Sequence, residues 1–173
     1  MRSLAGLVGL LLVSAAVSGC ASSRVSTTTR AQIDHPVRAV AMAPSGGLLA
    51  DAVALALFER GFNVYDTAQS SALLVRLDMT EVEVTEPQSL TALREQGIDA
   101  YLTVRAAAGH DGAPESAVVR LTSTHTGQVV AGLSWQNGRG GMAGSPADRM
   151  MRAGLAQAAD QIATAVAGVL PAP

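Results

Sequence analysis

The chain has 173 residues, of which 49% are hydrophobic and 15% are charged, and its formal net charge is −2. This composition supports one domain with a sizeable core and excludes a disordered, highly charged chain. All 12 basic residues are arginines, which excludes a P-loop lysine or a Schiff-base lysine. The weak net charge and the 3% aromatic content predict that the protein does not bind nucleic acid.

The first 19 residues have the layout of a secretory signal peptide. Arg2 supplies a cationic start, and residues 4–16 form an apolar run that small residues follow. The run is shorter than the roughly 20 apolar residues that a membrane-spanning helix needs. We therefore expect residues 1–19 to be cleaved.

Cys20, the only cysteine, ends the sequence Val17-Ser18-Gly19-Cys20. This sequence resembles the lipobox of bacterial lipoproteins, which implies a diacylglyceryl thioether and a further acyl chain such as palmitate on Cys20. Acyl chains hold a protein on a membrane without a spanning helix. Ala21 and Ser22 follow in place of an aspartate, and the resemblance then implies anchoring at the periplasmic face of the outer membrane. Residues 20–35 are rich in Ser and Thr, which predicts a flexible tether before a folded domain over residues 36–170.

A βαβ unit is predicted at the start of the domain. Residues 37–43 read as a buried strand, residues 48–60 as an amphipathic helix that Gly61 ends, and residues 62–65 as a second, parallel strand. Two short helices follow at 67–77 and 87–96, and the acidic stretch 78–86 remains unassigned.

Three alternating segments, 99–107, 117–124 and 129–136, predict an antiparallel meander. Folding the last two about the turn 125–128 pairs apolar residues on one face and buries Trp135 against the C-terminal helix. The other face of the meander is predicted to be polar and to include Val130. We interpret it as a partner interface, because Arg and Tyr often anchor interfaces; the alternatives are a solvated face or one that a helix covers. Its expected contact residues are Tyr101, Thr103, Arg105, Arg120 and Thr122.

A glycine-rich loop at 137–144 precedes a predicted continuous helix over residues 145–170, with Ser145 as its cap. The fold class is therefore α/β: a single mixed sheet, made of the βαβ unit and the meander, is packed by helices that include a long C-terminal one.

The order of these segments resembles the CsgG-like lipoproteins, a group that includes the curli secretion lipoprotein and, more distantly, the LpoB activator of peptidoglycan synthases. The resemblance rests on segments 40–44, 59–64, 97–100 and 120–130. It implies an α/β lipoprotein domain in the cell envelope. The chain departs from the curli protein in lacking spare amphipathic hairpins for a pore, and from LpoB in lacking a long proline-rich tether.

Four groups of residues are candidate chemical sites. The turn Ser45-Gly46-Gly47 and the loop Gly138–Gly144 with Arg139 read as connections, with anion binding as the alternative. We interpret the other two groups as solvated side chains. One group is the histidines His35, His110 and His125, and the other is the acidic residues Glu81, Glu83 and Glu86.

The sequence predicts a non-catalytic outer-membrane lipoprotein that acts as a periplasmic assembly or interaction module in envelope or surface-structure biogenesis. Its expected partners are the membrane and either an envelope protein or further copies of the same chain, without a cofactor or metal. Three alternatives remain open: a subunit of a homo-oligomeric secretion or appendage ring, a peptidoglycan-synthase activator, and a small-ligand binder or enzyme.

Overall fold

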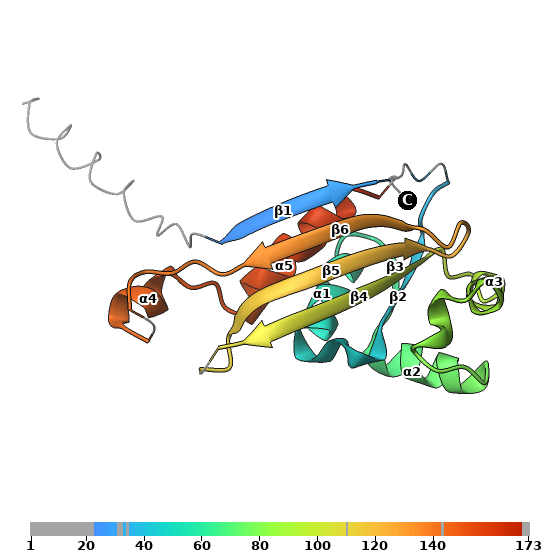
Figure 1. Cartoon of the computed structure of the whole chain (residues 1–173), viewed down its shortest axis with the longest axis horizontal. Coiled ribbons are helices and arrows are strands. Elements are labelled where there is room, and N and C mark those ends of the chain that lie inside the picture. The colour runs from blue at the N-terminus through green and yellow to red at the C-terminus, as the bar shows by residue number, and fades with distance from the viewer. Residues whose placement is uncertain (1–22, 31–32, 34, 110, 143, 171–173) are drawn as a thin grey trace, which may run out of the picture.

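The computed structural model describes residues 23–30, 33, 35–109, 111–142 and 144–170. They form a six-stranded mixed sheet in the order β1-β6-β5-β4-β2-β3, with helices on both faces (Figure 1). The strands are β1 (Arg24–Thr29), β2 (Ala39–Met42), β3 (Asn63–Tyr65), β4 (Ala100–Ala108), β5 (Pro114–Ser123) and β6 (Val129–Gln136). The helices are α1 (Gly47–Phe58), α2 (Thr67–Arg76), α3 (Pro87–Glu95), α4 (Pro146–Met151) and α5 (Leu155–Ala167), with the 3-10 turns η1 (Pro44–Gly46) and η2 (Glu83–Thr85). Within the described ranges, no helix has both the length and the apolar character to cross a bilayer.

The predicted βαβ unit is confirmed. Strand β2 is buried at every position and pairs in parallel with both β3 and β4. Helix α1 connects β2 to β3. Gly61 follows this helix and has a positive φ, a conformation that favours glycine. Helix α2 begins with a capping box in which Asp66 and Gln69 bond each other's backbone N–H groups.

The predicted meander is also confirmed, including its register. Leu121 lies opposite Ala131 and Val119 opposite Leu133, and Ala117 faces Trp135 on the same buried side. One detail of the prediction was wrong: a bulge shifts the register after Leu121, so that Thr122 pairs with Val129. The extra residue reverses the alternation of the pleat. Val130 therefore turns into the core, and Val129 replaces it on the polar face.

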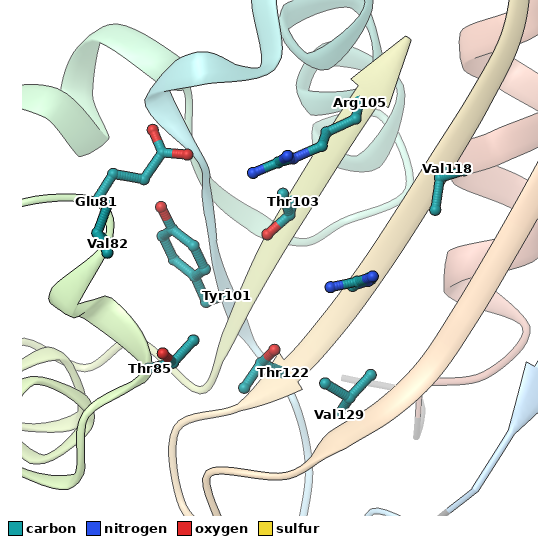
Figure 2. Close-up of a pocket in the computed structure, with 10 residues that line it drawn as sticks. Glu81, Val82, Thr85, Tyr101, Thr103, Arg105, Val118, Thr122 and Val129 are labelled. Carbon is teal, nitrogen blue, oxygen red and sulfur yellow. The ribbon is translucent and has the colours of Figure 1, made fainter.

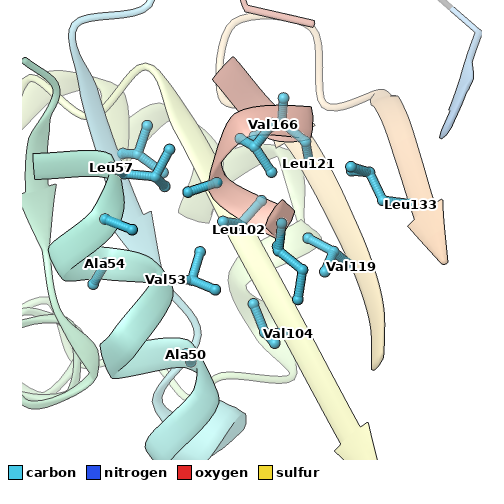
Figure 3. Close-up of a cluster of buried hydrophobic side chains, with 14 of the residues drawn as sticks. Ala50, Val53, Ala54, Leu57, Leu102, Val104, Val119, Leu121, Leu133 and Val166 are labelled. Atoms are coloured by element: carbon cyan, nitrogen blue, oxygen red, sulfur yellow. The ribbon is translucent and has the colours of Figure 1, made fainter. Parts of the chain in front are cut away.

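The hydrophobic core has two parts, one on each face of the sheet. The larger part lies between the sheet and helices α1 and α5, and Val53, Leu102 and Val166 belong to it (Figure 3). The smaller part lies on the opposite face, where α2, η2 and α3 cover Ala41 and Tyr101. Helices therefore cover both faces around β2, but only one face farther along the sheet.

The segment predicted to be a flexible tether is partly folded. Residues 24–29 form β1, the outermost strand, which pairs antiparallel with β6 from Arg24 opposite Gln136 to Thr29 opposite Ala131. Val25 packs against the main core, and the hydroxyl of Ser23 donates a hydrogen bond to Gln161 Oε1 (2.7 Å). The folded domain therefore begins before residue 36, and the predicted boundary was wrong. Cys20 and the signal peptide lie outside the described residues.

The predicted continuous C-terminal helix is broken into α4 and α5. Arg152 is extended, and Gly154 caps α5. The carboxamide of Asn137 stabilises the break: its oxygen accepts a hydrogen bond from the Ala153 N–H (2.7 Å), and its nitrogen donates to the Ala153 carbonyl (2.9 Å). These bonds satisfy backbone groups that a continuous helix would have satisfied internally.

Candidate functional site

The polar side of the meander forms an open sheet face. We use this name for the side of β4, β5, β6 and β1 that faces away from α1 and α5. Figure 1 shows α1 and α5 behind these strands, and no described helix lies in front of β5, β6 or β1. Val118 (51% exposed) and Val129 (46% exposed) project from this face.

A cavity of about 390 Å³ lies where the open sheet face meets the segment that contains η2. Figure 2 shows Glu81, Val82 and Thr85 on one side of it and the strand residues on the other. The strand residues include all five that the sequence placed together: Tyr101, Thr103, Arg105, Arg120 and Thr122. The β4–β5 register explains this convergence, because Tyr101 pairs with Thr122 and Thr103 with Arg120.

Two of these five residues are buried. Tyr101 and Thr122 are 4% and 6% exposed, because η2 and the residues around it cover the beginning of β4. Burial and, to a lesser extent, the charge of Glu81 raise the pKa of Tyr101 above its ordinary value. Among the described residues the Tyr101 hydroxyl has no hydrogen-bond partner, so the wall of the cavity holds a neutral, unsatisfied donor.

Arginines dominate the charge of the open sheet face. Arg105 and Arg120 line the cavity, and Arg120 and Arg30 line a second hollow on β1 and β6 of about 710 Å³. The ion pairs that the described residues form involve Arg60, Arg139 and Arg152, whereas Arg105 and Arg120 take part in none of them. A face with unpaired cations attracts an acidic partner.

Both backbone turns considered as anion sites hold a carboxylate of the same chain. Ser45 donates to Glu81 through its backbone N–H (2.9 Å) and its hydroxyl (2.5 Å). In the glycine-rich loop, the N–H groups of Gly144 (3.0 Å) and Gly140 (3.3 Å) donate to Asp148, which is buried. These bonds, Gly144 first, lower the pKa of Asp148. The turns therefore connect and fix elements of the fold.

Two histidines predicted to be separately solvated lie together. The rings of His35 and His125 have their centroids 3.9 Å apart, and His125 Nε2 lies 3.5 Å from Asp99 Oδ1. Asp99 Oδ2 also accepts hydrogen bonds from the backbone N–H groups of Arg38 (2.8 Å) and Ala39 (3.0 Å). The cluster thus joins the segment before β2 to the β5–β6 turn. Sequence spacing carries no signal for it, because the three residues are far apart in the chain; His110 lies outside the described residues.

The predicted acidic patch is divided among local contacts. Glu81 bonds Ser45, Glu83 accepts from the Thr80 N–H (2.7 Å) and hydroxyl (2.8 Å), and Glu86 contacts Gln88. Within the part of the chain that the structure describes, no group of three or more His, Cys, Asp or Glu residues has a geometry that could hold a metal ion.

The Asp99 carboxylate makes the stability of the domain vary with pH in the acidic range. Burial alone would raise the pKa of Asp99, but the hydrogen bonds from Arg38 and Ala39, together with His125, lower it below the ordinary 3.8. A lowered folded-state pKa contributes stability above the unfolded-state value, and that stability is lost as the pH falls through the folded-state value. We expect the Asp99→Asn variant to lose less stability than the parent protein below about pH 4. Urea unfolding at several pH values between neutral and strongly acid tests this, and parallel pH profiles would contradict it.

Comparisons with known proteins give low-identity structural matches. No protein-family model matches the chain, and neither does any curated protein. Among solved structures, the PelC dodecamer from Paraburkholderia phytofirmans is 18% identical with a TM-score of 0.49, covering 87% of this chain and 99% of that one. Lipoprotein GNA1162 from Neisseria meningitidis is 19% identical with a TM-score of 0.45, covering 75% and 94%. The C-terminal domain of LpoB from Salmonella enterica is 18% identical with a TM-score of 0.41, covering 60% and 86%.

These values describe partial similarity of structure, and they assign neither a family nor an activity to this chain. The resemblance to CsgG-like lipoproteins stays a prediction from the sequence.

Proposed function

We propose that this protein is a non-catalytic lipoprotein, anchored to the periplasmic face of the outer membrane through Cys20, whose domain binds an acidic segment of an envelope protein. The lipobox-like sequence Val17–Cys20 supports the anchor. The open sheet face supports the binding role, because it offers a hollow, exposed valines and arginines in one place.

The observation that carries the binding role is the pair Arg105 and Arg120 on neighbouring strands. Like charges on one sheet face repel each other modestly unless an acidic group lies opposite. A partner carboxylate removes this repulsion and forms charge-assisted hydrogen bonds with the guanidinium groups. Val118 and Val129 flank the arginines and supply apolar contact area.

The test combines a charge reversal with a crosslinker on the face itself. A photo-crosslinking amino acid at Val118, which is exposed and lines the cavity, is expected to form one dominant protein adduct in intact cells. The double substitution Arg105→Glu and Arg120→Glu is expected to abolish that adduct, because it turns attraction into repulsion. Mass spectrometry of the adduct identifies the partner and the segment in contact.

A matched control places the same charge change elsewhere. Arg76 and Arg94 lie in the last turns of α2 and α3, outside the cavity, and their double substitution to Glu is expected to keep the adduct. Thermal unfolding verifies that both variants are folded. If the adduct persists unchanged in the Arg105/Arg120 variant, the open sheet face is not the binding surface.

A second candidate is a homo-oligomer in which the acidic segment is this protein's own. Residues 78–86 contain Asp78, Glu81, Glu83 and Glu86 and no arginine, which complements the charge of the open sheet face. In that case the Val118 adduct is a dimer of this chain linked to residues 78–86.

A further inference from the structure

The docking of β1 fixes which end of the domain lies near residue 20. Ser23 is held by Gln161, and β1 begins at Arg24 beside the last residue of β6, Gln136. A chain spans at most about 3.3–3.6 Å per residue, so Cys20 lies within about 11 Å of Ser23. We call this end of the sheet, with residues 138–142 and 144–152 that follow β6, the anchor end. Figure 1 shows α4 projecting at the end where β1 begins.

The anchor end exposes two large apolar side chains. Met142 is 83% exposed and Met150 is 77% exposed, within the short stretch formed by the glycine-rich loop and α4. Methionine is flexible and adapts to irregular apolar surroundings. In water alone, this exposure leaves two apolar side chains without a packing partner.

The anchor end also carries arginines. Arg149 and Arg24 are exposed and take part in none of the ion pairs that the described residues form. Arg139 is paired with Glu115 (3.0 Å) but keeps 79% of its side chain exposed. The nearby acids are already engaged: Asp111 pairs with Arg152 (3.1 Å), and Asp148 is buried in the loop. The surface therefore combines apolar tips with cations, as membrane-surface segments do.

We infer that the anchor end lies against the lipid surface, with Met142 and Met150 among the headgroups and Arg149 and Arg139 at lipid phosphates. This inference rests on the proposed acylation of Cys20, which holds the surface within reach. Lipid phosphates attract arginines close to a membrane, and an arginine stem packs along apolar surface while its head stays hydrated. The strands then run away from the membrane, and the open sheet face is accessible from the side.

The test uses the full-length lipoprotein in nanodiscs of phosphatidylethanolamine and phosphatidylglycerol. Because acylation consumes the Cys20 thiol, a cysteine introduced at Met142 or Met150 is the one site that an environment-sensitive dye labels. We expect both labels to shift their emission to the blue and to lose intensity when spin-labelled lipids are added. A dye at Thr126, in the β5–β6 turn at the opposite end of the sheet, is the matched control and is expected to show neither change.

The outcomes separate this inference from the proposed function. Mass spectrometry of the N-terminal peptide reports whether Cys20 is acylated. An acylated protein whose labels at positions 142 and 150 behave like the Thr126 control would overturn the inference and leave the proposed function intact. An unacylated Cys20 would overturn both, because the anchor that holds this end of the domain within reach of the lipid would be missing.

Discussion

Replacing Trp135 with alanine is expected to lower the free energy of unfolding by about 3–5 kcal/mol. Trp135 is the only tryptophan of the chain and is fully buried, beside Ala117 on β5. Its indole Nε1 donates a hydrogen bond to Gln161 Oε1 on α5 (2.7 Å), and the same oxygen accepts from Ser23. The substitution therefore opens a cavity and loosens the contact between α5, β6 and the residue before β1. Urea unfolding monitored by circular dichroism measures the change.

Two variants make this prediction specific. Trp135→Phe keeps most of the buried apolar area and loses the hydrogen bond, so its destabilisation is expected to be smaller. Val118→Ala removes a half-exposed valine from the open sheet face and is expected to change stability by less than about 0.5 kcal/mol. In the parent protein the emission of Trp135 is expected at short wavelength and shielded from iodide. Red-shifted emission that iodide quenches readily would contradict the burial of Trp135.

Replacing Asn137 with alanine is expected to cost about 2–4 kcal/mol, because buried polar groups lose their partners. The Asn137 side chain accepts from the Ala153 N–H and donates to the carbonyls of Ala153 and Pro114 (2.7 Å). Ala153 is fully buried, so water does not readily replace the missing bonds. The variant is expected to weaken the joint between β5, β6 and the break between α4 and α5.

Hydrogen exchange localises this effect. In Asn137→Ala, the amide of Ala153 is expected to exchange faster, whereas amides of α2, at the far side of the sheet, are expected to keep their rates. Asn137→Asp is the matched variant. It keeps the acceptor for the Ala153 N–H but loses both donors, and it places a negative carboxylate beside two carbonyl oxygens. The variant is therefore also expected to be destabilised. Unchanged exchange at Ala153 in both variants would show that the carboxamide does not hold the break.

Short-range sequence patterns predicted most of the sheet. The alternation in residues 117–136 and the turn around Gly127 were sufficient for the register, because one slipped residue would have exposed Val119, Leu121 and Leu133 together. The same register predicted that Arg105 and Arg120 share a face. Local signals failed at the bulge, since Val129 and Val130 are chemically identical and either can face the core.

The remaining errors concern contacts between distant segments. Residues 24–29 contain one apolar residue, Val25, among arginine, serine and threonines, so their strand forms only because β6 offers a partner. The apolar stripe of the C-terminal region continues across residues 152–154, and the bonds from Asn137 that interrupt the helix are invisible in the local pattern. Gly154 was the one local signal for that break.

The place of β1 in the sheet has a consequence for the reach of an anchored domain. β1 is an edge strand whose partners in β6 lie more than a hundred residues away in the chain, so its pairing closes a long loop at a cost in chain entropy. While β1 is docked, two residues lie between Cys20 and Ser23, so an acyl anchor on Cys20 would hold the domain close to the bilayer. Release of β1 alone would leave Ile33 packed against the core and His35 beside His125, so that the chain from Cys20 to Ile33 could extend up to about 45 Å. With the proposed anchor on Cys20, the strength of the β1–β6 pairing would set how far the rest of the domain extends from the membrane.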